Sequence, residues 1–190
     1  MQDSLKLPFQ FEPTRLQADL RQVLVEEYVP HFNKAYYQGD WSVVPFRSVG
    51  GLANHIYPDP TAQKAFADTP LLGRCPYIRE VMANFLCPQQ AVRFLRLKSG
   101  SFIKEHTDYN LGYEDGDVRI HIPVMTNPNV EFILDGRRVQ MQEGDAWYHN
   151  FNLRHSVANR GTTDRIHLVI DCTVNDWLRD VLLSADAAHS

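Results

Sequence analysis

Residues 117–139 read DVRIHIPVMTNPNVEFILDGRRV, and this stretch indicates how the second half of the chain folds. Valine and isoleucine alternate with Arg119 and His121, which is the two-residue period of a strand with one buried face. A second apolar run follows after turn residues and ends at Asp135-Gly136. This pair suits a two-residue primed turn, because both central residues of such a turn have positive φ. The stretch therefore predicts a strand followed by a β-hairpin.

Similar short runs continue on both sides of this stretch. Eight β-prone runs with turn residues between them follow Pro88: AVRFLRLKSG, FIKEHTD, DVRIHIPVMT, VEFILDG, RRVQM, DAWYHN, RHSVANRG and DRIHLVID. A further turn is expected at Glu143-Gly144-Asp145. This spacing is typical of an all-β sandwich or barrel. With helices packed outside, it predicts a mainly β fold of the double-stranded β-helix class, which is a jelly-roll, cupin-like architecture.

Helical patterns are confined to the two ends of the chain. Residues 14–29 place apolar side chains at helical spacing, and residues 76–86 predict a second helix, preceded by a shorter one at 61–67. A closing helix is expected to begin at the capping residue Asn175. We therefore expect a helical and loop-rich first part.

The length of 190 residues is that of one domain. We expect a single domain over 1–190, divided into a helical N-terminal part (about 1–88), a jelly-roll core (about 89–173) and a closing helix (about 175–187). The charge of −4 and the scattered 19 basic residues argue against nucleic-acid binding. Three widely spaced cysteines suggest neither a disulfide framework nor a zinc pair. Without a signal-like start or an apolar span, a soluble, cytoplasmic protein with no membrane contact is expected.

Three side chains have the types and spacing of a metal site. His106 and Asp108 are two residues apart in EHTDYN, so they point to the same side of a strand end. His155, in FNLRHSVANRG, lies on a different predicted strand that a folded sheet can bring close. Two imidazoles and one carboxylate leave one face of an ion open, as in non-haem iron(II) oxygenases. The alternative is a polar pair on a strand surface.

Arg165 begins the strand DRIHLVID, where a buried guanidinium needs an acidic partner. A dicarboxylate co-substrate is one such partner, and a structural salt bridge to Asp164, Asp171 or another internal acid is the alternative. Arg119 and His121 share one strand face, so they point together into the barrel or out of it. Pointing inward, they could bind the second carboxylate of the co-substrate or an acid group of the substrate.

Four motifs in this order, HTDYN, RIHIPV, DAWYHNFNLRHSVANRG and DRIHLVID, resemble the aspartyl/asparaginyl β-hydroxylase family. That family also holds bacterial hydroxylases of free amino acids such as proline. The resemblance covers approximately residues 93–171. It implies Fe(II) as the metal, with these ligands: His106, Asp108 and His155. The presence of Asp108 argues against relatives that bind iron through two histidines only and against halogenating relatives.

The resemblance also implies 2-oxoglutarate and O2 as co-substrates. Arg165 would hold the distal carboxylate of 2-oxoglutarate, whereas Arg119 and His121 would contact its other end or the substrate. Proline-hydroxylating relatives carry a further C-terminal helical region, but this sequence stops soon after Trp177. Free proline is therefore one candidate among several, which include a peptide, a carrier-tethered amino acid and another small metabolite.

The expected function is hydroxylation of an unactivated C–H of an amino acid, free or in a peptide, coupled to decarboxylation of 2-oxoglutarate to succinate. The expected partner is thus a small molecule or a peptide. One alternative is a cupin-like module that binds a small acid without oxidation. Another is a desaturase or epimerase that uses the same site.

Other conspicuous residues have structural interpretations. Trp147 and Tyr148 are expected to pack in the core, and His149 and His167 are expected to be ordinary strand or surface histidines. Residues 47–59, with Gly50-Gly51 and His55, are a candidate lid or substrate-binding loop. Tyr109 and Asn110, beside the candidate ligands, either orient Asp108 or the substrate or pack in a turn.

Overall fold

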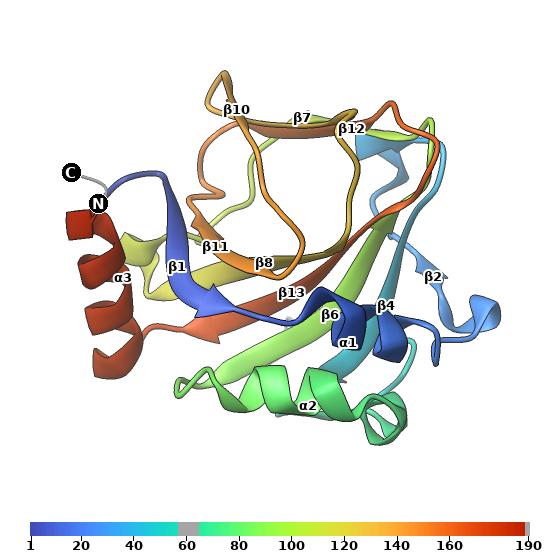
Figure 1. Cartoon of the computed structure of the whole chain (residues 1–190), viewed down its shortest axis with the longest axis horizontal. Coiled ribbons are helices and arrows are strands. Elements are labelled where there is room, and N and C mark those ends of the chain that lie inside the picture. Colours follow the sequence, from blue (N-terminus) through green and yellow to red (C-terminus); the bar gives the residue numbers. More distant parts are fainter. Residues whose placement is uncertain (57–64, 189–190) are drawn as a thin grey trace.

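Two antiparallel sheets face each other in the computed structural model, which describes residues 1–56 and 65–188 (Figure 1). Sheet A has eight strands in the spatial order β1 (Ser4–Gln10), β11 (Asp145–His149), β8 (Asp117–Met125), β13 (Arg165–Thr173), β6 (Gln89–Leu97), β4 (Trp41–Val49) and β2 (Val29–Pro30), with β5 (Phe66–Asp68) paired to β4. Sheet B has five, in the order β10 (Arg137–Val139), β9 (Val130–Leu134), β12 (His155–Asn159), β7 (Phe102–His106) and β3 (Tyr37–Gln38). The predicted mainly β, jelly-roll class is confirmed.

All eight predicted β-prone runs form strands, and they are β6 to β13. The hairpin between β9 and β10 turns at Asp135 and Gly136, whose φ angles are 47° and 72°. Gly144, with φ of 84°, makes the turn before β11. Both turns lie where the sequence predicts them.

The central strand β13 has two buried faces of opposite character. Ile166, Leu168 and Ile170 belong to the main apolar core, whereas Arg165 and the residues at every second position after it lie on the other face. Only a strand covered on both sides can bury both sets. The polar face of β13 therefore lines the space between the sheets.

Three helices cover sheet A on the side away from sheet B or stand at its end: α1 (Pro13–Leu20), α2 (Pro76–Ala83) and α3 (Asp176–Ala188) (Figure 1). Short 3-10 turns occupy Val25–Glu27, Lys34–Tyr36, Pro70–Arg74 and Tyr113–Asp115. The predicted cap of the closing helix is confirmed, because Leu178 N–H donates to Asn175 Oδ1 at 2.9 Å. None of the helices in the described residues is long and apolar enough to cross a membrane.

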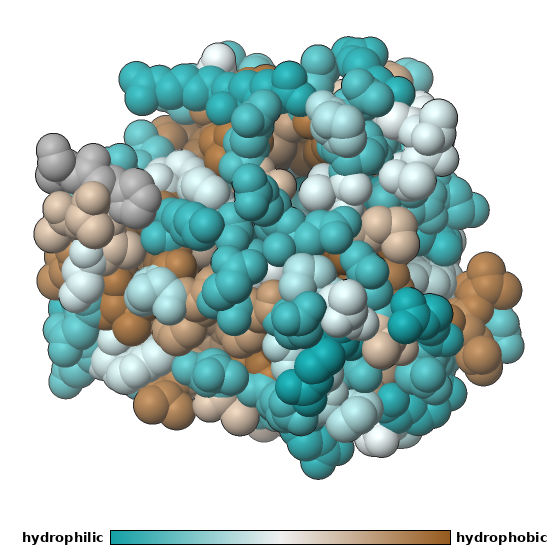
Figure 2. All heavy atoms as spheres, viewed as in Figure 1, coloured by the Kyte–Doolittle hydropathy of each residue, from teal (hydrophilic) through white to brown (hydrophobic). Residues whose placement is uncertain are grey.

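The predicted helix at 14–29 is too long. It ends at Leu20, and residues 29–30 pair with β4 instead. Leu24 and Val25 are 49% and 74% exposed, so neither of them packs against the core after α1 ends. An apolar projection stands at the right-hand edge of Figure 2, in the place of the turn before β2 in Figure 1.

The first part of the chain consists mainly of helices and loops, as the sequence predicts, but it also contains strands that were not predicted. It supplies β1 and β4, which pair with β11 and β6 of the later part. Residues 47–49 of the candidate lid belong to β4, and 57–59 lie outside the described residues. Of the short helix predicted at 61–67, residues 61–64 also lie outside them, and Phe66–Asp68 is β5. Long-range pairing determines these segments more than local propensity does.

Candidate active site

His106, Asp108 and His155 converge at one end of sheet B. His106 ends β7 and His155 begins β12, and the two residues are direct neighbours in the register of these strands. One ligand atom from each of the three side chains lies within 4.8 Å of the others. The two imidazole rings are 4.2 Å apart between centroids. The sequence-predicted triad therefore has the spacing of side chains that share one ion.

The hydrogen bonds of both imidazoles leave the same nitrogen free for a metal. His106 Nδ1 lies 2.8 Å from the Lys104 carbonyl and His155 Nδ1 lies 3.0 Å from the Leu153 carbonyl. A carbonyl only accepts, so both rings carry a proton on Nδ1, and Nε2 is the nitrogen left to bind a metal. Burial is the main reason why the pKa of His155 is lowered to about 4, which keeps the ring in its neutral, metal-binding form. Two imidazoles and a carboxylate fit iron(II).

Asp108 is held on its other side by an arginine. Arg119 Nη1 donates to Asp108 Oδ2 at 2.6 Å, while Asp108 Oδ1 lies 3.8 Å from His106 Nε2. The backbone N–H of Asp108 donates to the Phe151 carbonyl at 2.9 Å. The carboxylate is therefore fixed with one oxygen directed toward the two histidines.

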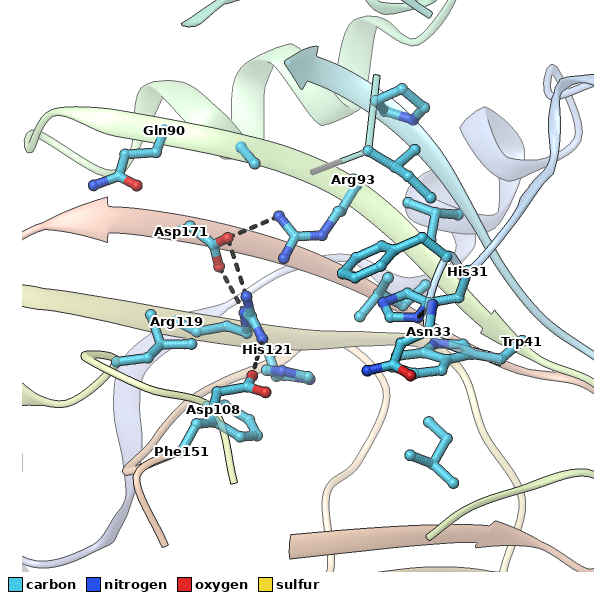
Figure 3. Close-up of a pocket in the computed structure, with 18 of the residues that line it drawn as sticks. His31, Asn33, Trp41, Gln90, Arg93, Asp108, Arg119, His121, Phe151 and Asp171 are labelled. Atoms are coloured by element: carbon cyan, nitrogen blue, oxygen red, sulfur yellow. Dashed lines mark hydrogen bonds and ion pairs between the residues drawn. The ribbon is translucent and has the colours of Figure 1, made fainter. Parts of the chain in front are cut away.

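Arg119 belongs to a charged row that crosses three strands, as Figure 3 shows. Its Nε donates to Asp171 Oδ1 at 2.7 Å, and Arg93 Nη1 donates to Asp171 Oδ2 at 2.8 Å. Burial raises the pKa of Asp171, but the two arginines outweigh burial and lower it to about 2. Burial lowers the pKa of Arg119, but Asp171 and Asp108 outweigh it and raise the pKa. Arg119 therefore points into the barrel, which is one of the two orientations that the sequence allowed.

Among the arginines of the site, Arg165 alone has no carboxylate partner in the described part of the chain. It is 2% exposed, its Nη2 lies 3.2 Å from His167 Nδ1, and its Nε has no partner there. Burial alone lowers its pKa to about 9. Within the described residues Arg165 forms no salt bridge to Asp164 or Asp171, and Asp171 pairs with Arg93 and Arg119 instead. A buried, unpaired guanidinium indicates a site for an anion.

The triad and Arg165 line one cavity of about 350 Å³. Arg93, Arg119 and Asp171 line it as well. His31, stacked on Trp41 with 3.5 Å between ring centroids, lies opposite this charged row (Figure 3). The cavity thus combines a candidate metal site, a candidate anion site and a charged wall.

Two residues on the inner face of sheet A line the cavity although the sequence did not predict them as site residues. Arg93 was not singled out, and Asp171 was considered only as a partner for Arg165. His149 and His167 are strand residues, but they are 0% and 1% exposed, so the surface interpretation is wrong. The alternation of polar and apolar residues in DRIHLVID was the available signal for His167 and Asp171.

The remaining candidates lie at the edges of the site. Tyr148 is buried in the core, as predicted, and its hydroxyl oxygen accepts from Tyr113 N–H. Tyr109 is 88% exposed, and Asn110 adopts a left-handed φ of 55° beside it. His55 lines the cavity from the loop after β4.

The fold and the cavity define a protein of the double-stranded β-helix class. A profile of the Aspartyl/Asparaginyl beta-hydroxylase family matches residues 11–174. The chain belongs to this family.

Individual relatives agree with this family. The chain is 29% identical over 166 residues to an L-proline cis-4-hydroxylase of Rhizobium meliloti (strain 1021), a match that covers 85% of this chain and 57% of the relative. The chain thus spans little more than half the length of that curated relative.

Solved structures with the same fold include a prolyl-4-hydroxylase from Pseudomonas putida, with a TM-score of 0.55, 14% identity, and coverage of 91% of this chain and 93% of that one. A viral collagen prolyl hydroxylase from Paramecium Bursaria Chlorella virus-1, solved with 2OG, gives a TM-score of 0.54 at 10% identity, with 91% and 97% covered. At these identities the likeness establishes a shared fold.

Proposed function

We propose that this chain is an iron(II)- and 2-oxoglutarate-dependent dioxygenase that hydroxylates an unactivated C–H of an amino acid, free or within a peptide. The proposed reaction also converts 2-oxoglutarate and O2 into succinate and carbon dioxide. The observation that carries the proposal is one cavity lined by both the His106–Asp108–His155 triad and the unpaired Arg165. Family membership supports the same reaction class.

The triad would hold the metal. His106 and His155 offer their Nε2 atoms, and Asp108 offers the oxygen that Arg119 leaves free. Iron(II) bound there would supply the oxidising chemistry by activating O2, with 2-oxoglutarate as the source of two electrons. The protein itself would keep the two imidazoles and the carboxylate in the positions that a metal ion needs.

Arg165 would hold the distal carboxylate of 2-oxoglutarate. A guanidinium with a free Nε–H can form two parallel charge-assisted bonds to one carboxylate. Because the surroundings of Arg165 are buried and neutral, its attraction for an anion is little screened by water. A dicarboxylate would thereby supply the partner that the folded chain lacks.

The charged wall supports an amino-acid substrate. Arg93 donates Nη1 to Asp171 on the cavity side of sheet A, so the remaining N–H groups of this guanidinium could hold the carboxylate of an amino acid. Arg119 already shares its donors between Asp108 and Asp171. We therefore assign Arg119 the orientation of Asp108, and leave direct contact with substrate to the remaining donors of this wall.

The test is a turnover assay with protein reconstituted anaerobically with iron(II) and 2-oxoglutarate, then exposed to O2. Free amino acids, including proline, and short peptides are screened for substrate-stimulated succinate formation. Product mass then shows whether one oxygen atom is gained or two hydrogens are lost, which separates hydroxylation from desaturation. Binding of 2-oxoglutarate without succinate formation for any substrate would favour the acid-binding module instead.

A further inference from the structure

Three buried side chains form a hydrogen-bonded row on the inner face of sheet A. Arg165 Nη2 and His121 Nδ1 each lie 3.2 Å from the same atom, His167 Nδ1. The exposed fractions of Arg165, His121 and His167 are 2%, 5% and 1%. In the strand register, His121 of β8 lies directly opposite Val169 of β13, one alternate position from His167. This row lies next to the proposed co-substrate site without belonging to the metal triad.

The contacts of the row determine where each imidazole carries its proton. A guanidinium can only donate, so His167 Nδ1 must be the acceptor and its ring must carry the proton on Nε2. His121 Nδ1 faces that same bare nitrogen, so His121 must donate from Nδ1. Its Nε2 is then a bare acceptor, and this buried atom has no partner within residues 1–56 and 65–188. The two neutral histidines therefore have opposite tautomers.

The surroundings keep both rings neutral. Burial, followed by the neighbouring charge of Arg165, lowers the pKa of His167 well below its usual value. Burial lowers the pKa of His121 well below its usual value too, with His167 and Arg165 as the next causes. A proton on His167 Nδ1 would face the Arg165 donor and break the row.

We infer that His167 is a positioning residue for Arg165 and that His121 supports His167 rather than binding a carboxylate itself. His167 accepts one donor of Arg165 and so leaves Nε, which lacks a partner within the described residues, for the co-substrate. His121 presents only a lone pair on Nε2, and a lone pair repels a carboxylate oxygen. This differs from the expectation that His121 contacts 2-oxoglutarate, and it rests on the proposed function for the identity of the anion.

Binding experiments with protein loaded with iron(II) under anaerobic conditions test the role of His167. His167→Leu removes the acceptor, whereas His167→Asn keeps an amide oxygen near the place of Nδ1. We expect the Leu variant to weaken 2-oxoglutarate binding about tenfold and the Asn variant by no more than about threefold. Pyruvate, a 2-oxo acid without the distal carboxylate, serves as the control ligand and should bind all three proteins equally. Thermal unfolding of each variant confirms that it is folded.

A double-mutant cycle separates positioning from a general packing effect. If His167 acts through Arg165, His167→Leu should cause no further loss of 2-oxoglutarate binding in an Arg165→Ala background. The same loss in both backgrounds, or an equal loss of pyruvate binding, would overturn the inference. Equal binding by the Leu, Asn and unchanged proteins would overturn it as well.

Nuclear magnetic resonance of protein with 15N-labelled histidine tests the tautomers without metal or co-substrate. Nitrogen shifts distinguish protonated from bare nitrogens, and His167→Asn and His121→Gln assign the signals. We expect the proton on Nδ1 of His121 and on Nε2 of His167, and the reverse pattern would contradict the row. If these tautomers are found but the unchanged protein binds neither iron(II) nor 2-oxoglutarate, the proposed function fails while the tautomer assignment holds.

Discussion

At the scale of single residues, Asp108 uses its two oxygens for different purposes. Oδ2 accepts a hydrogen bond from Arg119 at 2.6 Å, and Oδ1 stays on the side of the two histidines. Because Arg119 is itself fixed by Asp171, the orientation of Asp108 depends on a residue of another strand. The geometry of the candidate metal site is therefore set partly from sheet A, although two of its candidate ligands belong to sheet B.

Two alanine variants should separate metal binding from co-substrate binding. His155→Ala removes one of three ligands and should abolish both iron binding and turnover. Arg165→Ala should leave iron bound but raise the 2-oxoglutarate concentration needed for half-maximal rate by about 100-fold or more, since a charge-assisted pair is lost. Metal analysis and succinate assays measure the two effects. Loss of iron in both variants would point to a folding defect.

Removing the charge of Asp171 should destabilise the fold. Asp171→Asn keeps the shape but leaves Arg93 and Arg119 close together with their shared acid neutralised. We expect the free energy of unfolding to fall by about 3–5 kcal/mol. Glu105→Gln is the matched control, because Glu105 pairs with Arg154 at the surface and should matter by less than about 1 kcal/mol. Urea unfolding measures the free energy of unfolding of both variants. Similar losses in the two would contradict the stabilising role of the Asp171 ion pairs.

Arg93 shows why part of the site could not be predicted from single residues. AVRFLRLKSG holds two arginines three positions apart, and an odd spacing in a strand puts them on opposite faces. Arg93 faces the cavity, whereas Arg96 stacks over the ring of Tyr28 at 3.7 Å from its centroid. Only the register against β13 and β4 shows which arginine points inward. By contrast, the spacing of His106 and Asp108 sufficed to predict that their side chains lie close together.

At the scale of elements, the strands of the second half could be predicted because each has its own turn signals and alternation. β1 and β4 could not, since β1 pairs with β11, whose residues lie far away in the sequence. Its SLKLPFQ does alternate, with Leu5 and Leu7 buried, but a single short run is weak evidence by itself. The length of the helix predicted at 14–29 was overestimated, because local periodicity carries no information about the pairing of β2 with β4.

The closing helix α3 should depend strongly on which of two adjacent leucines is shortened. Leu182 is 0% exposed in the main core, whereas its neighbour Leu183 is 47% exposed. Leu182→Ala should reduce the free energy of unfolding by about 2–5 kcal/mol, because it leaves a cavity. Leu183→Ala should change it by about 0.5 kcal/mol or less. Equal losses in urea unfolding would mean that α3 does not pack as described.

The free energy of unfolding of the protein should depend on pH through its buried histidines. Burial, followed by Arg165 and His155, lowers the pKa of His149 to about 3. An unfolded imidazole titrates near the reference pKa of about 6.5, so from there down to about pH 3 only the unfolded state binds this proton. The free energy of unfolding should therefore decrease as pH falls through this window, by up to about 1.4 kcal/mol per unit for His149.

His149→Gln tests this linkage in the metal-free protein. Urea unfolding between pH 6.5 and 4 should give a shallower dependence of the unfolding free energy on pH for the variant. An unchanged slope would show that His149 is hydrated or protonated in the folded state.

The proposed ligands should connect the two sheets. Metal would bind at β7 and β12 of sheet B, and 2-oxoglutarate would also bind at β13 of sheet A. At 100 times its dissociation constant, a ligand of the folded state stabilises it by about 2.7 kcal/mol. Hydrogen exchange should therefore slow in both sheets when iron(II) and 2-oxoglutarate are added anaerobically. In Arg165→Ala, the added effect of 2-oxoglutarate on β13 should disappear, and its persistence would argue against this binding mode.

The alternation of side chains along β13 limits which insertions the sequence of this protein can accept. Arg165, His167 and Asp171 share one side of a strand whose other side is apolar and covered. One residue inserted after Arg165 would turn His167 and Asp171 toward the apolar core and turn isoleucine and leucine toward the cavity. Loops at the rim of the cavity can lengthen without exchanging the two faces of β13. Substrate specificity can therefore change there while β13 keeps its length.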